Sequence, residues 1–130
     1  MKPNVVLTVT SLLSILLFSI HVTDDIGRGF DSWGPGKLLF VVTLVVLLYG
    51  TLVLAERRSG LVIIFLGGLF TALMPVLHMR MRADFVKSSG ALFYLWTLLA
   101  LGATGTLSAT LALRELRRRQ VPSVAADQGR

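Results

Sequence analysis

The two histidines, His21 and His78, are the residues of this chain best suited to chemistry. Asp24 and Asp25 follow His21 by three and four residues, so a helix continuing past His21 would place a carboxylate one turn above the imidazole. Imidazole and carboxylate groups bind zinc and iron, and histidine also serves acid–base catalysis near neutral pH. The pattern therefore predicts a divalent metal or ligand site formed by His21, Asp24, Asp25 and His78.

Two other interpretations compete with a metal site. A haem held by one histidine from each of two helices is the less favoured of them. The default is interfacial, because histidines and acids at helix ends commonly meet only headgroups and water. Asp24 and Asp25 would then pair with Arg28, Arg80 or Arg82. These arginines are themselves candidates for contact with a lipid phosphate or another anion, since guanidinium suits bidentate contacts.

The composition is that of an integral membrane protein. The mean hydropathy is +0.75, and charged residues make up 15% of the 130 residues, against ~25% in soluble domains. The chain has no cysteine, which excludes disulfides and thiolate metal sites. Its net charge of +6 comes from short basic segments between apolar runs. Because they form no basic stripe with interleaved aromatic residues, no nucleic-acid partner is expected.

Four uncharged apolar runs, 5–20, 38–55, 61–77 and 91–113, define the expected elements. A membrane-spanning helix needs about 20 residues, so residues that flank the shorter runs would complete them. Strands of a membrane barrel would instead alternate with period two. We therefore predict an all-α membrane protein, a four-transmembrane-helix antiparallel bundle. Its helices are expected at about 5–22, 38–55, 61–79 and 90–113 in a single domain 1–119, followed by a disordered tail, 120–130.

The first run has the size of a signal-peptide core, which is the rival interpretation of it. The residues that follow it have no A-x-A-like pattern of small side chains. We therefore expect a retained transmembrane helix.

The distribution of Lys and Arg indicates the orientation of the bundle. With four spans, eight of these residues share the side of the two termini and five lie on the other side. This favours cytoplasmic termini (N-in, C-in) in a multi-pass protein of the cell inner membrane. His21 and His78 then lie at one level on the outer side. Tyr94 and Trp96 fit an aromatic belt near that side, and Arg114–Arg119 is expected to contact anionic lipids at ~1 kcal/mol per residue.

Small residues recur on the third and fourth runs at the spacing of close helix contacts. They are Gly67, Gly68, Thr71 and Ala72 on the third run, and Gly102, Gly105, Thr106, Ala109 and Thr110 on the fourth. This pattern favours contact between these two helices, with a homodimer as the alternative.

The first functional hypothesis is a structural or accessory membrane protein that binds a partner membrane protein or a second copy of itself. The second is a metal- or ligand-binding protein, with a catalytic role included, that uses the His/Asp cluster. Sequence motifs of Ser hydrolases and of P-loop proteins are absent, so no enzymatic activity is assigned. The apolar runs hold no charged residue, which argues against an ion-coupled transporter.

Overall fold

A computed structural model describes residues 3–27, 35–81 and 90–120; for residues 3–4, 35–36 and 79–81 it describes the backbone alone. This part of the chain forms four helices and no strand: α1 (Pro3–Gly27), α2 (Pro35–Leu52), α3 (Arg58–Met81) and α4 (Ala91–Arg118). The predicted all-α class is confirmed. Three helices are long and apolar enough to cross a membrane, namely α1, α3 and α4, while the apolar part of α2, Lys37–Leu52, is shorter. These helices support a membrane-embedded protein.

The helices differ from the expected ranges mainly at their ends. The first helix continues through the polar residues to Gly27, and the fourth continues through basic residues to Arg118. The second ends at Leu52 rather than at residue 55, and the third already begins at Arg58. Hydropathy marks the part of a helix that suits lipid, whereas backbone hydrogen bonding continues into water without regard to it. The expected tail, 120–130, lies beyond the described residues except for Gln120.

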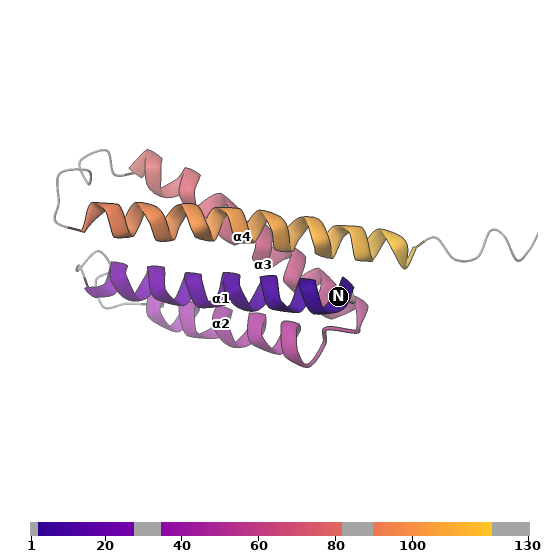
Figure 1. Cartoon of the computed structure of the whole chain (residues 1–130). Helices are drawn as coiled ribbons and strands as arrows, with labels where there is room; N and C mark the ends of the chain where they lie inside the picture. The colour runs from indigo at the N-terminus through magenta and orange to yellow at the C-terminus, as the bar shows by residue number, and fades with distance from the viewer. Residues whose placement is uncertain (1–2, 28–34, 82–89, 121–130) are drawn as a thin grey trace, which may run out of the picture.

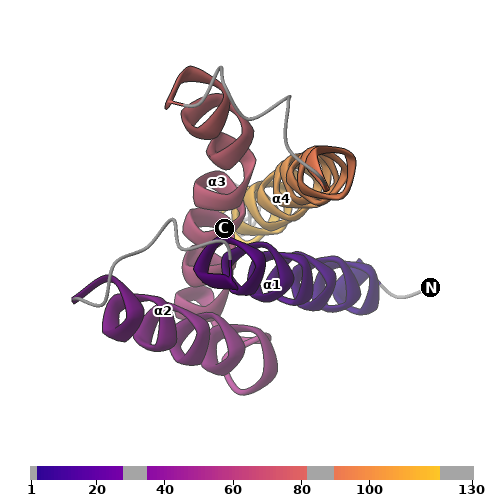
Figure 2. The ribbon, with the colours of Figure 1, turned by 90° about the vertical axis from the view of Figure 1, so that its left-hand side faces the viewer.

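The bundle has two distinct ends (Figure 1). The helices α1 and α3 run in the same direction, so both reach the end of the bundle where α4 begins. The helix α2 returns alongside α1 to the opposite end, where a short link joins it to α3. Viewed from the first of these ends, α3 is tilted across the other helices (Figure 2). We call the end with the last turns of α1 and α3 the histidine end, and the other the basic end.

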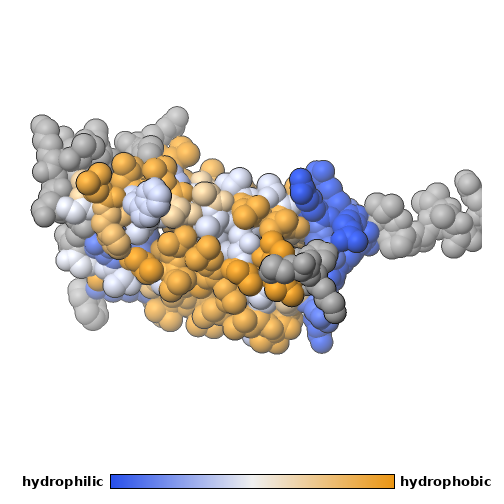
Figure 3. Space-filling view, in the orientation of Figure 1, coloured by the Kyte–Doolittle hydropathy of each residue, from blue (hydrophilic) through white to orange (hydrophobic). Residues whose placement is uncertain are grey.

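The surface of the bundle separates apolar from charged residues. Hydrophobic side chains cover the middle of the face drawn in Figure 3, and hydrophilic ones gather at the basic end. Many large apolar side chains are exposed along all four helices, among them Leu38, Leu66 and Trp96. Exposure on this scale is unusual for a protein in water but expected for one surrounded by lipid.

The closest helix contact joins α3 and α4 at glycine residues. A β-carbon on Gly68 would lie 2.7 Å from the Ala109 nitrogen and 2.8 Å from the Gly105 carbonyl oxygen. A β-carbon on Gly105 would lie 2.7 Å from the Ala72 nitrogen. The two backbones therefore approach as closely as the small residues predicted, within one chain. Thr106 and Thr110 are exposed, so that side of α4 takes no part in the contact.

Hydroxyl groups link α1 to α2 inside the bundle. Ser11 and Thr51 are buried, and their side-chain oxygens are 2.8 Å apart in a hydrogen bond. An interhelical bond of this kind in a membrane protein contributes on average about 0.6 kcal/mol.

We expect Ser11→Ala to lower the free energy of unfolding by about this amount, because it removes the hydrogen bond and leaves Thr51 buried. Thr51→Ala and the double variant complete a mutant cycle, which can be measured by reversible unfolding in mixed detergent micelles. A coupling energy of zero would show that the two hydroxyls do not interact.

Candidate metal centre

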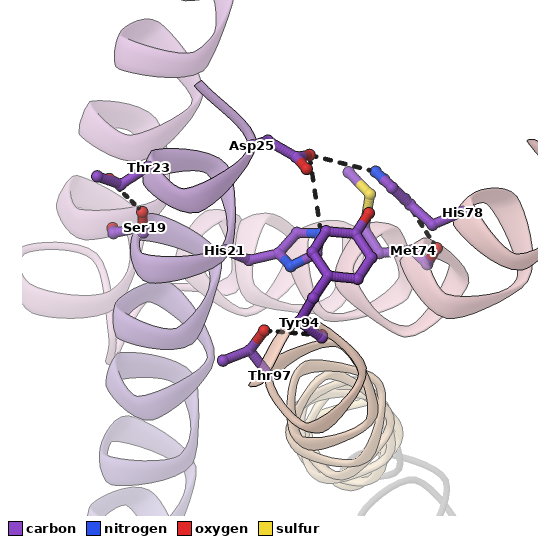
Figure 4. A network of polar contacts seen from close by, with 8 residues as sticks. All are labelled: Ser19, His21, Thr23, Asp25, Met74, His78, Tyr94 and Thr97. Carbon is purple, nitrogen blue, oxygen red and sulfur yellow. Dashed lines mark hydrogen bonds and ion pairs between the residues drawn. The ribbon is translucent and has the colours of Figure 1, made fainter. Parts of the chain in front are cut away.

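Three of the four predicted ligands meet at the histidine end of the bundle. One ligand atom from each of His21, Asp25 and His78 lies within 4.8 Å of the other two. The Nε2 atom of His78 is 3.4 Å from Oδ2 of Asp25, and Nε2 of His21 is 3.9 Å from the same oxygen. The carboxylate therefore lies between the two imidazoles, as Figure 4 shows.

The extension of α1 past its apolar run places His21 and Asp25 on one face. The two residues are four apart in a continuous helix, so their side chains lie one above the other. Because α1 continues to Gly27, the carboxylate is held by helical backbone rather than by a loop.

His21 is the most deeply buried member of the group. Its side chain is 1% exposed, and its ring lies against the rings of Tyr94 and His78, with centroid separations of 4.8 and 5.1 Å. Neither ring nitrogen has a hydrogen-bond partner among the described residues. A buried polar group without a partner costs roughly 1–3 kcal/mol, so a bound cation would relieve an unfavourable arrangement.

The ring of His78 is oriented by its own helix. Its Nδ1 atom is 3.1 Å from the carbonyl oxygen of Met74, one turn earlier. With Nδ1 donating to this carbonyl, Nε2 faces Asp25 with its lone pair available to a metal. Histidine ligands of metals commonly donate their other ring N–H to a backbone carbonyl or carboxylate in this way.

The last turns of α3 are positioned by a contact between a proline of α3 and a glycine of α4. Pro75, three residues before His78, packs on Gly102 of α4, where a β-carbon would lie 2.7 Å from the proline Cγ. Tyr94, two turns before Gly102 on α4, borders both imidazoles, with its ring centroid 6.2 Å from that of His78. The site is therefore built from three helices.

The distances suit a metal ion after a small adjustment. Two ligands bound to tetrahedral zinc at ~2.0–2.1 Å lie roughly 3.3 Å apart. The His78–Asp25 separation of 3.4 Å already has this value, and the His21–Asp25 separation of 3.9 Å exceeds it by little. All three ligand atoms lie within 4.8 Å of one another, so the widest separation must close by at most roughly 1.5 Å for one ion to bind all three.

No protein family, curated protein or solved structure matches this chain. Its function is therefore inferred from its own residues. Two imidazoles and one carboxylate are the protein ligands of several catalytic zinc sites and of non-haem iron centres.

The remaining predicted site residues lie outside this group. Asp24 is partly buried on α1, one residue from Asp25, and is not among the three converging ligands. The side chains of Arg28, Arg80 and Arg82 are outside the described part of the chain, so the anion or lipid contact predicted for them stays a prediction.

Tyr94 was missed as a neighbour of the site. The sequence places it in an aromatic belt with Trp96, and Trp96 is indeed 72% exposed, but Tyr94 is only 5% exposed. The two residues differ by two positions and therefore point to different sides of α4. A count of helical faces in α4 would have separated them, although it could not have shown that Tyr94 meets the histidines.

We expect Gly102→Ala to weaken metal binding without changing any ligand. The added methyl group must displace Pro75, and the displacement moves the last turns of α3, including His78. Changes in the shell around a metal commonly cost 10–100-fold in affinity, and we expect a loss of about tenfold. Zinc titration of the purified variant measures it, with Gly27→Ala as the control, because no atom lies within 4 Å of a β-carbon there. Equal affinities in the two variants would contradict this role of the proline.

Proposed function

We propose that this protein is a small membrane protein that binds one divalent transition metal ion through His21, Asp25 and His78. The observation that carries the proposal is the convergence of these ligand atoms within 4.8 Å around a histidine that is 1% exposed. An interfacial role does not need such an arrangement, since histidines that only meet headgroups and water gain nothing from burial. Three protein ligands leave a fourth position on the ion for a further ligand.

The experiment that tests this function is a metal titration of the purified, metal-stripped protein in detergent or nanodiscs. We expect one zinc ion per chain by elemental analysis after dialysis. The variant His21→Ala/His78→Ala, purified in the same way, is expected to retain none. Equal zinc content in the two proteins would refute the site.

We further propose that all four helices cross the inner membrane with both termini in the cytoplasm. The support is that α2 runs alongside α1 over much of its length, toward the basic end (Figure 1). At 1.5 Å per residue its 18 residues extend about 27 Å, close to the ~30 Å hydrocarbon core. The metal site then faces the periplasm or the cell exterior.

Reporter fusions test this topology. We expect a reporter fused after residue 30 to be located outside the cytoplasm, and a reporter fused after residue 125 to be located inside it. The two positions are separated by an odd number of spans in this arrangement. If both reporters are active in the same compartment, the four-span arrangement is wrong.

Lipid contact at the basic end is part of the same proposal. Arg119 is engaged within the chain, where it pairs with Glu115 and donates to the Glu56 carbonyl oxygen. Arg114, Arg117 and Arg118 are exposed, although Arg118 also lies 3.5 Å from Glu115, and basic residues beside an anionic leaflet contribute about 1 kcal/mol each. These three are therefore the residues proposed to bind anionic headgroups.

A structural or accessory role that depends on a protein partner has less support. Gly68 and Gly105, the small residues best suited to a partner helix, already contact each other's helices within the chain. The metal site therefore provides the more specific function.

A further inference from the structure

Met74 of α3, whose carbonyl oxygen faces His78, carries a further atom that can bind a metal. Met74 and His78 are four residues apart on α3, as His21 and Asp25 are on α1. Because α1 and α3 run in the same direction and Asp25 meets His78, Met74 lies at the level of His21. Figure 4 shows the Met74 thioether on the side of α3 that faces Asp25 and Tyr94.

The backbone of Met74 is tied to the same centre. Its carbonyl oxygen lies 3.1 Å from Nδ1 of His78, which fixes both residues to one face of α3. Met74 is partly buried. A ligand set of two nitrogens, one oxygen and one sulfur is therefore available from two pairs of residues at the same helical spacing.

The sulfur atom changes the metal that the site prefers. A thioether is a soft ligand that selects copper(I), whereas the usual zinc ligands in proteins are thiolate, imidazole and carboxylate, and manganese and magnesium prefer oxygen. Imidazole suits both copper(I) and copper(II), and nitrogen and oxygen sites hold copper(II) more tightly than the other divalent ions of the first transition row. The chain has no cysteine, so methionine is its only source of sulfur.

We propose that the metal of this site is copper and that Met74 supplies its fourth ligand through Sδ. The inference rests on the proposed metal-binding function and adds the identity of the ion. His21, His78 and Met74 bind copper(I), and Asp25 adds a charged oxygen ligand that favours copper(II). The site therefore accepts both oxidation states of the ion.

The first test compares two methionine variants by competition for copper(I) with a colorimetric copper(I) chelator. Met74→Leu keeps the size and apolarity of the side chain but removes the sulfur, and Met79→Leu is the matched control. We expect copper(I) affinity to fall at least about tenfold in Met74→Leu, which is about 1.4 kcal/mol, and to stay unchanged in Met79→Leu. Zinc affinity is expected to be equal in both variants, which shows that the site remains folded.

X-ray absorption of the copper(I)-loaded protein gives a second, independent readout. We expect one sulfur scatterer, which can come only from a methionine, and its disappearance in Met74→Leu but not in Met79→Leu. A copper(I) site with nitrogen ligands alone overturns the assignment, as does a sulfur signal that survives Met74→Leu.

The outcomes separate this inference from the function on which it rests. If zinc binds through the two histidines but Met74→Leu has the same copper(I) affinity as the native protein, only the copper assignment is wrong. If neither metal binds the native protein, the metal-binding function itself is wrong.

Discussion

Replacing His21 with alanine is expected to lower the zinc affinity of the protein by more than about 100-fold. Residues that merely orient metal ligands are worth 10–100-fold in affinity, and His21 is proposed to be a ligand. The substitution removes one of two imidazoles and leaves a small cavity beside Tyr94 rather than a competing group. Competition with a zinc-binding dye, in detergent at fixed pH, measures the affinity of the native and variant proteins.

The two neighbouring aspartates provide a matched control. Asp25→Asn replaces the carboxylate whose Oδ2 lies 3.4 Å from His78, while Asp24→Asn removes the same charge one residue away, outside the converging group. We expect the first variant to lose most of the affinity and the second to stay within about threefold of the native protein. Equal losses would mean that the acids act only through their general negative charge, which contradicts direct coordination.

The second large effect is expected from Gly105→Ala, through stability rather than chemistry. A β-carbon at this position would lie 2.7 Å from the Ala72 nitrogen and 2.8 Å from the Gly68 carbonyl oxygen. Both are backbone atoms, so relief requires α3 and α4 to move apart along their most extensive contact. Overpacking of this kind costs about 1–3 kcal/mol, and we expect the upper part of that range because movement of the nearby Thr71 hydroxyl would not relieve the two backbone contacts.

Gly27→Ala again serves as the comparison, because a β-carbon there meets no atom within 4 Å. Unfolding of both variants in mixed detergent micelles gives the two changes in free energy. If Gly105→Ala is no less stable than Gly27→Ala, the close approach of α3 and α4 is not a feature of the folded protein. Because α4 also carries Tyr94, the same variant should weaken metal binding.

The helical class could be predicted because apolar runs of this length leave few alternatives in a bilayer. The convergence of two histidines could be expected for a similar reason, since helices one and three of an up-and-down bundle end at the same side. The ends of the helices were less predictable. Residues 23–27 are mostly polar and lie beyond the predicted helix 5–22, but they continue α1 and thereby fix the position of Asp25.

The choice between Asp24 and Asp25 could not be made from the sequence. Adjacent residues of a helix differ by about 100° in direction, and only the rotation of α1 against α3 decides which carboxylate meets His78. That rotation depends on tertiary contacts, among them His21 against Tyr94. The role of Pro75 was equally hidden, because its partner Gly102 is far away in the sequence.

X-ray absorption of the zinc-loaded native protein shows whether α1 and α3 bind one metal ion together. The multiple-scattering signal of imidazole counts the histidine ligands, and the chain has only His21 and His78 to supply them. We expect two imidazoles at ~2.0–2.1 Å from one zinc ion, and one imidazole in each single alanine variant. A spectrum with one imidazole or none in the native protein would contradict this shared site.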